Sequence, residues 1–276
     1  MTASPPLDGA LATRVLQRFG MPDRPQATES TLRHLLDRYT RIVPWESASR
    51  IVRRAKHDSQ EDCPVFAEAF WESALERGTG GTCYESNYAF FSLLRRLGYD
   101  GYLTINDMGT SIGCHSAIII WLEGRKHLVD VGFPLHAVLP LPEPETETVT
   151  VEGQFFHYRI IAGEASRYSI WRHPHPRDLV FTLVDEPVSD VDYRAITVHD
   201  YRHDGGQFLN EVVIHKVINE ELWRFNSDDS PPHLQVFVDG RRQNHYLDGD
   251  VAGQLASTFD MDRVTVAGAM RAMGLT

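Results

Sequence analysis

Hydrophobic residues recur every three to four positions along the first part of the chain, which indicates amphipathic α-helices. Two such stretches precede position 44, and their apolar positions are Leu11, Val15, Phe19, Leu32, Leu35, Leu36 and Tyr39. Gly20 follows the first stretch and favours a helix end there. Pro44 requires the second helix to stop before it. We therefore expect two helices within residues 7–43.

A third helix is predicted to begin at Asp62 and Pro64. Asp62 is a residue type that caps helix N-termini, and proline is favoured in the first helical turn. Phe66 and Phe70 continue an apolar face, and Gly78 marks the end of the helix.

A glycine-rich turn at residues 78–81 leads into a fourth helical stretch, which begins at Cys83 and ends before Gly98. Apolar side chains cover most of its circumference, so we expect a central, buried helix. Arg95 and Arg96 occupy its last turn, where positive charge is favoured.

Beyond Gly98 the pattern changes to short apolar runs and to alternation with a period of two, which indicates β-strands. The predicted strands cover residues 99–105, 117–122, 127–131, 155–161, 168–171 and 179–184. Their close spacing favours an antiparallel sheet or a small barrel. Residues 140–150, rich in Pro, Glu and Thr, are interpreted as a surface loop. From about position 190 the pattern mixes helix and strands and ends in a helix.

Composition narrows the class of protein. The chain has 276 residues, with 27 Lys and Arg against 38 Asp and Glu. The resulting net charge of −11 argues against nucleic acid or an anionic membrane as the main partner. No apolar run approaches the roughly 20 residues of a spanning helix, and the N-terminal residues lack the pattern of a signal peptide. We therefore expect a cytoplasmic protein.

The three cysteines are Cys63, Cys83 and Cys114, too few for a disulfide framework and not spaced as a metal site. Cys83 stands where the glycine-rich turn meets the helix N-terminus. Unpaired backbone N–H groups and the positive end of the helix dipole stabilise a thiolate there, so Cys83 is a candidate nucleophile. The alternative is a structural thiol that packs as a small hydrophobic side chain.

A predicted hairpin supplies candidate partners for Cys83. Residues 115–134 contain two apolar runs joined at Glu123-Gly124, a turn signal. With those two residues as the loop, Asp130 and His115 lie diagonally on the same sheet face and can form a hydrogen bond. A carboxylate that orients an imidazole beside a thiol forms a catalytic triad. The alternative is that both polar residues serve only the strand end and the turn.

Histidine clusters elsewhere give little indication of a metal. His173 and His175 alternate with prolines, and His199, His203 and Asp204 lack the glutamate of a zinc protease motif. We expect no metal, and no glycine-rich nucleotide-binding loop is present in the sequence.

Four segments taken together resemble the arylamine N-acetyltransferase family. They are Pro44-Trp-Glu-Ser, Gly80-Gly-Thr-Cys-Tyr-Glu-Ser-Asn, His115 and Asp130-Val-Gly-Phe. The family shows a Pro-aromatic-Glu-Asn segment, a Gly-Gly-x-Cys-aromatic-Glu-x-Asn motif, a histidine at a strand start and Asp-Val-Gly-Phe after the next strand. The resemblance covers nearly the whole chain.

The resemblance implies an α+β fold with a cysteine-protease-like core. Its parts are a helical bundle (1–98) with Cys83, an antiparallel β-barrel (99–189) with His115 and Asp130, and an α/β lid (190–276). It also implies ping-pong chemistry, in which acetyl-CoA acylates Cys83 and an aromatic amine or hydrazine then takes the acyl group. His115 acts as base and acid and Asp130 orients it, while Trp45 and Phe133 match aromatic residues near the substrate.

Three departures from the family pattern concern the surroundings of the triad. Gly78-Thr79 stands where the family has an arginine pair, which removes a cation beside the nucleophile. Ser47 replaces the asparagine of the first motif, and Pro134 follows Asp-Val-Gly-Phe in place of glycine. These differences put the acyl donor and the acceptor in question.

Two alternatives to this transferase remain open. An amide synthase or a hydrolase would use the same triad with a carrier-bound or other acyl donor, because a thioester can react with water or with a built-in amine. A non-catalytic binding protein would retain the fold and keep Cys83 as an inert thiol.

Overall fold

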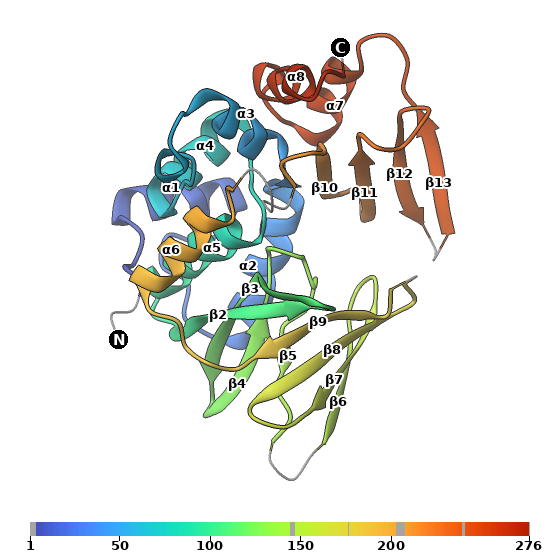
Figure 1. Ribbon diagram of the computed structural model, residues 1–276. Coiled ribbons are helices and arrows are strands. Elements are labelled where there is room, and N and C mark those ends of the chain that lie inside the picture. The colour runs from blue at the N-terminus through green and yellow to red at the C-terminus, as the bar shows by residue number, and fades with distance from the viewer. Residues whose placement is uncertain (1–3, 144–146, 176, 203–207, 239–240, 276) are drawn as a thin grey trace.

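The first part of the chain is helical in the computed structural model, which describes residues 4–143, 147–175, 177–202, 208–238 and 241–275 (Figure 1). Its helices are α1 (Gly9–Phe19), α2 (Glu29–Ile42), α3 (Ala48–Lys56), a 3-10 helix (Gln60–Asp62), α4 (Ala67–Arg77) and α5 (Cys83–Arg96). Asp8 caps α1 by accepting hydrogen bonds from two backbone N–H groups. Gly20 ends α1 with φ of 69°. The two helices predicted within residues 7–43 are confirmed.

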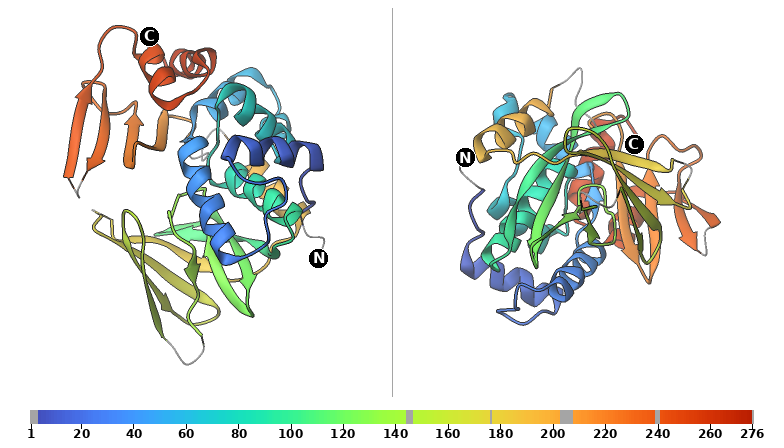
Figure 2. Two further views of the ribbon diagram at one scale, coloured as in Figure 1. Left: turned by 180° about the vertical axis from the view of Figure 1, so that it is seen from behind. Right: turned by 90° about the horizontal axis from the view of Figure 1, so that it is seen from below.

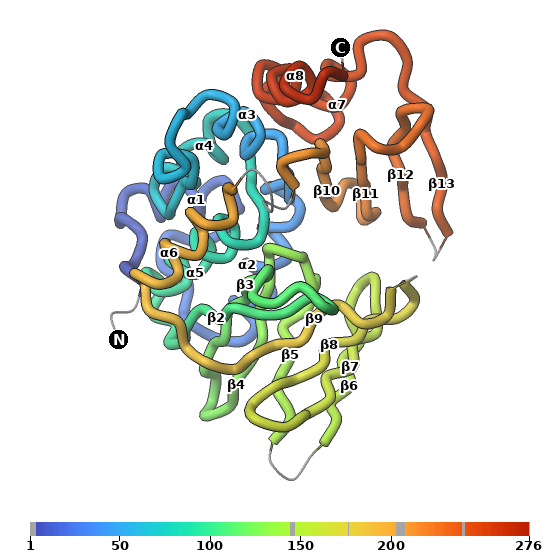
Figure 3. Tube along the Cα trace, viewed as in Figure 1, coloured from blue at the N-terminus to red at the C-terminus, as the bar shows by residue number. Residues whose placement is uncertain are grey.

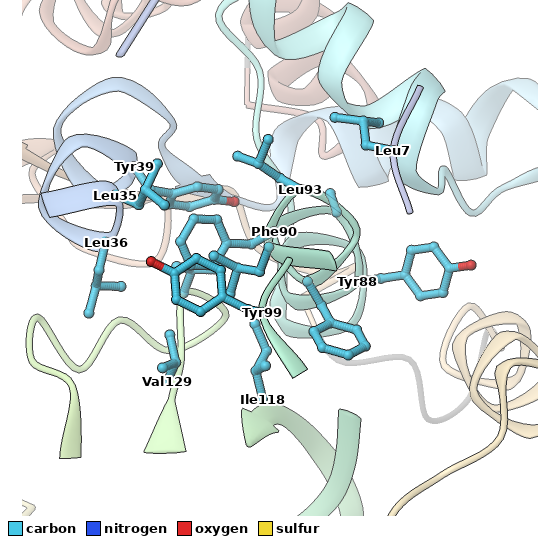
Figure 4. Packing of buried hydrophobic residues seen from close by; sticks show 14 of the residues in the cluster. Leu7, Leu35, Leu36, Tyr39, Tyr88, Phe90, Leu93, Tyr99, Ile118 and Val129 are labelled. Carbon is cyan, nitrogen blue, oxygen red and sulfur yellow. The ribbon is translucent and has the colours of Figure 1, made fainter. Parts of the chain in front are cut away.

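Helix α5 is central and buried, as predicted. All residues from 83 to 94 are buried. Phe90 faces Tyr39 of α2, with ring centroids 5.1 Å apart, and the same apolar cluster reaches Ile118 and Val129 of the barrel (Figure 4). Burial of each large apolar side chain contributes roughly 1.5–3 kcal/mol to folding. Helix α5 is therefore a well-fixed support for its first residue.

The predicted start of the third helix is wrong. Asp62 lies in the 3-10 helix, and α4 begins at Ala67 rather than at Pro64. A tertiary contact explains the difference, because the backbone N–H of Val65 donates to Oε1 of Glu85 on α5 at 3.0 Å. A hydrogen bond to α5 thus overrides the local signal. The predicted end of the helix, at residue 78, is confirmed.

The described residues of the central part form an eight-stranded antiparallel sheet that is nearly closed into a barrel (Figure 1). Its order is β5-β4-β3-β2-β9-β8-β7-β6. The strands are β2 (Asp100–Met108), β3 (Ser111–Leu122), β4 (Arg125–Val129), β5 (Leu139–Pro140), β6 (Thr148–Glu152), β7 (His157–Ala162), β8 (Arg167–His173) and β9 (Leu179–Val184). The predicted barrel is confirmed, but part of the predicted loop at 140–150 is strand. Strand β6 was not predicted because it is a half-exposed edge strand that is rich in polar residues.

The last part of the chain builds a second antiparallel sheet with order β1-β10-β11-β12-β13. The helices and strands of this part of the chain are α6 (Asp190–His199), β10 (Val213–Ile218), β11 (Glu221–Asn226), β12 (His233–Val238), β13 (Arg241–Tyr246), α7 (Val251–Phe259) and α8 (Arg263–Ala272). Strand β1 (Trp45–Glu46) comes from the helical part, and Trp45 pairs with His215 of β10. Figure 2 shows this sheet and the two last helices from behind and from below. The α+β architecture implied by the resemblance is confirmed.

The hydrophobic cores cross the predicted domain boundaries. Ala48 and Ile51 of α3 belong to the same apolar cluster as α7 and α8. Tyr193 of α6 donates to the carbonyl oxygen of Tyr84 on α5 at 2.8 Å, and Figure 3 shows α6 next to α5. The division at positions 98 and 189 stays a prediction. Within the described ranges, no helix has both the length and the apolar character needed to span a membrane.

Candidate active site

Cys83 is the first residue of α5 and follows the glycine-rich turn, as predicted. Only 7% of the residue is exposed. Its Sγ atom lies 3.8 Å from the carbonyl oxygen of Cys114 on β3. The hydroxyl of Ser116 donates to the carbonyl oxygen of Cys83 at 3.0 Å. The two neighbours of His115 therefore both contact Cys83, and β3 lies directly against the start of α5.

The β3–β4 hairpin has the register that brings His115 and Asp130 together. Glu123 and Gly124 form a two-residue loop with φ of 51° and 80°, as in a type I′ turn. One further step of the ladder places Asp130 opposite Ala117. Nε2 of His115 lies 2.7 Å from Oδ2 of Asp130, and both side chains are buried. The predicted hairpin and its hydrogen bond are confirmed, whereas the catalytic roles stay predictions.

The other carboxylate oxygen of Asp130 accepts three hydrogen bonds. They come from Nδ2 of Asn87 at 2.9 Å and from the backbone N–H groups of Gly132 at 2.7 Å and Phe133 at 3.0 Å. Oδ1 is thus held by helix and turn while Oδ2 is directed to the imidazole of His115. The sequence analysis included Asn87 in a motif but gave it no role. The signal that could have found it is its position about one helical turn after Cys83, on the helix that begins with the candidate nucleophile.

Gly132 brings the turn after β4 into contact with the nucleophile. A Cβ atom built on Gly132 would lie 2.4 Å from Cα of Cys83 and 2.5 Å from Nδ2 of Asn87. No side chain fits at such distances, so only glycine allows this approach. The turn that carries Asp130 is therefore packed against the backbone of Cys83.

The turn before Cys83 rests on a buried glutamate that the sequence analysis did not single out. Oε1 of Glu46 accepts from the backbone N–H of Gly80 at 3.0 Å, and Oε2 accepts from that of Ser49 at 2.8 Å. Burial raises the pKa of Glu46, and the hydrogen bonds from Ser49 and Gly80 oppose this rise. A Cβ on Gly80 would lie 1.7 Å from the carbonyl oxygen of Pro44. The Pro-Trp-Glu segment therefore fixes the shape of the glycine-rich turn.

The expectation that the helix N-terminus favours a thiolate at Cys83 stays a prediction, because other groups around the sulfur act in the opposite direction. Burial raises the pKa of the Cys83 thiol, and the negative charges of Asp200 and Asp130 act in the same direction. The charge of Arg50 opposes them but has a smaller effect. A buried thiol whose pKa is raised attacks a carbonyl carbon only slowly unless a neighbouring base takes its proton. His115, which is hydrogen-bonded to Asp130 and whose two neighbours on β3 contact Cys83, is the candidate for that base.

Arg50 places a cation near the nucleophile, although the arginine pair of the family is absent at positions 78–79. Arg50 of α3 is completely buried and pairs with Asp200 at 2.8 Å. Its Nη1 lies 3.5 Å from Oγ1 of Thr82, the residue before Cys83. The hydrophobic pattern missed Arg50 because α3 carries many charged residues and was not predicted as a helix.

Trp45 contacts the turn after β4, and Phe133 is part of that turn. The indole N–H of Trp45 donates to the carbonyl oxygen of Gly132. Trp45 also packs edge-on against His215, with centroids 5.3 Å apart. The ring of Phe133 is half-buried and lies 6.3 Å from the ring of His115. Both aromatic residues adjoin the triad, and their contact with substrate stays a prediction.

The histidine clusters considered for a metal do not form a site in the part of the chain that is described. No group of three or more His, Cys, Asp or Glu side chains there is arranged to hold an ion. Nδ1 of His175 contacts the backbone of Arg177. His203 and Asp204 lie outside the described residues.

Comparison with known proteins identifies the architecture. The profile of the N-acetyltransferase family matches residues 29–229. An arylamine N-acetyltransferase of Mycolicibacterium smegmatis is 26% identical over 265 residues, 92% of each chain. The proansamycin X synthase of Amycolatopsis mediterranei is 31% identical over 128 residues, 43% of this chain and 46% of that protein. The Mycobacterium marinum arylamine N-acetyltransferase in complex with CoA superposes with a TM-score of 0.78 at 19% identity, covering 95% of this chain and 99% of that one.

Proposed function

The chain belongs to the arylamine N-acetyltransferase family, and on that basis we propose that it transfers an acyl group through a thioester on Cys83. The family establishes an enzyme that carries out acetyl transfer. The acyl-enzyme route, the acceptor and the roles of the triad are our proposal. The observation that carries it is the His115–Asp130 pair, 2.7 Å apart and buried beside the start of α5.

In the first half-reaction the sulfur of Cys83 attacks the carbonyl carbon of acetyl-CoA. Because Nε2 of His115 is hydrogen-bonded to Asp130, the other ring nitrogen, Nδ1, accepts the proton of the thiol. The bond between the acyl carbon and the sulfur of CoA then breaks. CoA leaves as a thiol after taking the proton back from the imidazole. The product is an acetyl thioester on Cys83.

In the second half-reaction the nitrogen of an aromatic amine or hydrazine attacks that thioester. His115 accepts the proton that the amine loses and returns it to the sulfur of Cys83 as the carbon–sulfur bond breaks. The products are an amide and the free thiol. Asp130, held by Asn87 and two backbone N–H groups, keeps the imidazole in one orientation through both steps.

Acetyl-CoA is the proposed donor because a relative of the same fold was solved with CoA. No metal takes part in the proposed reaction. The cytoplasmic location and the lack of a nucleic-acid or membrane partner stay predictions.

A second candidate function is amide synthesis from another acyl donor. It is favoured by the similarity to proansamycin X synthase, at 31% identity over 128 residues. The same Cys83 thioester would form, but from a donor other than a CoA thioester. The chemistry of the triad does not distinguish the two, so the donor decides between them.

The test is intact-protein mass spectrometry after mixing with acetyl-CoA, longer acyl-CoA thioesters or a reactive aryl ester, followed by peptide mapping. We expect one acyl adduct on Cys83 that is discharged by an added arylamine. Cys83→Ala should lose the adduct, whereas Cys63→Ala and Cys114→Ala should keep it. Asp130→Asn should slow acylation by about 10³-fold or more, because the imidazole then adopts the wrong tautomer.

Other outcomes separate the alternatives. An adduct from the aryl ester but from no CoA thioester supports the amide synthase. No adduct, together with no reaction of Cys83 with iodoacetamide, contradicts any acyl-enzyme route and supports the inert thiol.

A further inference from the structure

Arg172 on β8 is a buried cation close to the proposed catalytic centre. Only 8% of Arg172 is exposed. Among the described residues, no carboxylate lies within ion-pair distance of its guanidinium. Its Nη2 lies 3.0 Å from Nε2 of His175, while its Nε is buried with no hydrogen-bond partner in the same part of the chain. A charged group buried without a counter-ion is costly, which indicates a place for an anion.

The ring of Phe133 connects this guanidinium to the triad. The central carbon of Arg172 lies 4.7 Å from the centroid of Phe133 on one side and 5.1 Å from that of Phe156 on the other. The ring of Phe133 is in turn 6.3 Å from the ring of His115. These distances limit the separation between imidazole and guanidinium to about 11 Å. A single aromatic side chain, Phe133, therefore contacts both Arg172 and His115, the proposed base.

Two further buried polar atoms near Arg172 have no hydrogen-bond partner in the described residues. They are the hydroxyl of Tyr158 and Nδ1 of His136. Tyr158 lies directly across the β7–β8 ladder from Arg172. The charge of Arg172 lowers the pKa of His136, so the two groups lie within electrostatic range. Buried polar groups in native proteins are normally paired, so unpaired polar groups gathered near one buried cation mark a candidate ligand position.

The side chains that contact the Arg172 guanidinium suit an anionic ligand with an aromatic ring. The other close neighbours of Arg172 are the aromatic rings of Phe133 and Phe156 and the imidazole of His175. Burial lowers the pKa of His215, and the charges of Arg224 and Arg172 lower it further, so His215 also lies within electrostatic range of Arg172. Guanidinium binds carboxylate and phosphate through paired hydrogen bonds, and aromatic rings beside it accommodate the ring of a ligand.

We propose that Arg172 is a specificity-determining residue that binds the carboxylate of an aromatic amine acceptor. This inference rests on the proposed function, since it names the acceptor of the second half-reaction. A benzene ring with a carboxylate at one end and an amine at the other suits the separation of at most about 11 Å between the guanidinium of Arg172 and the imidazole of His115. The phosphates of CoA fit less well, because the whole pantetheine arm separates them from the reacting sulfur.

The experiment compares 4-aminobenzoate with its uncharged methyl ester in the wild type and in Arg172→Met. We expect the wild type to prefer the acid, and Arg172→Met to lose about 10- to 100-fold in kcat/KM for the acid, mainly through KM. The ester should change by less than about threefold. The matched control is Arg159→Met, which removes an exposed cation stacked on Trp171 from the neighbouring strand and should change neither substrate.

Inhibition of the wild type by benzoate gives a second readout that does not depend on the folding of a variant. We expect benzoate to inhibit competitively against the amine and methyl benzoate to inhibit at least tenfold more weakly. Arg172→Lys should restore part of the preference, because it keeps the charge but loses the paired hydrogen bonds.

Three results would overturn the inference. They are equal losses for acid and ester, no preference for the acid in the wild type, and a raised KM for acetyl-CoA with an unchanged acid-to-ester ratio, which assigns Arg172 to the phosphates. In each case acetylation of Cys83 still occurs if the proposed function is right. Loss of the Cys83 adduct in the wild type is the separate failure of that function.

Discussion

Nδ2 of Asn87 lies 2.9 Å from Oδ1 of Asp130, so the helix that begins with Cys83 holds the carboxylate that orients His115. The same Nδ2 donates to the carbonyl oxygen of Ser116 at 2.7 Å, and Oδ1 of Asn87 accepts from the N–H of Val131 at 3.0 Å. A single amide side chain therefore links α5, β3 and the turn after β4. It fixes the three parts of the candidate triad relative to one another.

Replacement of Asn87 by alanine should affect both activity and stability. It removes the hydrogen bonds that Asn87 makes to buried groups of Ser116, Asp130 and Val131, which costs about 2–4 kcal/mol of unfolding free energy. We expect kcat/KM to fall by about 10- to 100-fold, because Asp130 gains freedom. Denaturant unfolding and steady-state kinetics measure the two effects. Asn226→Ala, which removes an amide hydrogen bond on β11, is the control and should leave kcat/KM unchanged.

The pH dependence of Cys83 alkylation should reveal its base. Burial raises the pKa of the thiol, so the thiolate forms only at a higher pH unless His115 takes the proton. In a background without Cys63 and Cys114, His115→Ala should lower the iodoacetamide rate at pH 7 by at least tenfold and shift its pH profile upward. Superimposable profiles with and without the imidazole would contradict the assignment of His115 as base.

Gly132→Ala should disrupt the site through a steric clash. Its Cβ would lie 2.4 Å from Cα of Cys83, so either α5 or the turn has to move. Overpacking of this kind costs about 1–3 kcal/mol, and we expect at least a 100-fold loss of acylation rate. Gly9→Ala is the control, because no atom lies within 4 Å of its Cβ and the residue is in the first turn of α1. A near-normal acylation rate for Gly132→Ala would show that this close approach is unnecessary.

Two histidines should contribute to the loss of stability in acid. Burial lowers the pKa of His136 and of His215 to about 3, and nearby arginines act in the same direction. Their ordinary pKa is 6.5, so between pH 6.5 and 3 the unfolded chain binds more protons than the folded chain. The stabilisation is therefore present above pH 6.5 and declines as the pH falls toward 3.

Thermal unfolding from pH 8 to pH 4 tests this prediction. The melting temperature of the double variant His136→Gln/His215→Gln should fall by less over that pH range than the melting temperature of the wild type. His157→Gln is the control, because His157 is exposed at the start of β7. Parallel pH curves for the wild type and the double variant would show that other groups cause the acid loss.

Local signals determined most of the elements and the candidate nucleophile. The helical spacing from Leu11 to Phe19 and the stop at Gly20 depend only on neighbours along the chain, and α1 follows them. The Glu123-Gly124 turn fixed the register of the hairpin, since side chains on a strand alternate between faces. From this register alone His115 and Asp130 were expected to form a hydrogen bond, and they do.

The misplaced elements are those whose local signal competes with a contact distant in sequence. The start of α4 is displaced because Val65 is held by Glu85, twenty positions away. Helix α3 was not predicted because one of its buried residues, Arg50, is charged and so does not look like a core residue. Its burial depends on the ion pair with Asp200.

The sequence by itself determined the family, the helical, barrel and mixed parts of the fold, and the three candidate triad residues, because these depend on periodicity and on short motifs. Only the tertiary structure decided the burial of Cys83, the support of Asp130 by Asn87 and the isolation of Arg172 from any described carboxylate. Burial and electrostatic interaction depend on distances between segments far apart in the chain. Such distances are set by packing, which no local pattern specifies.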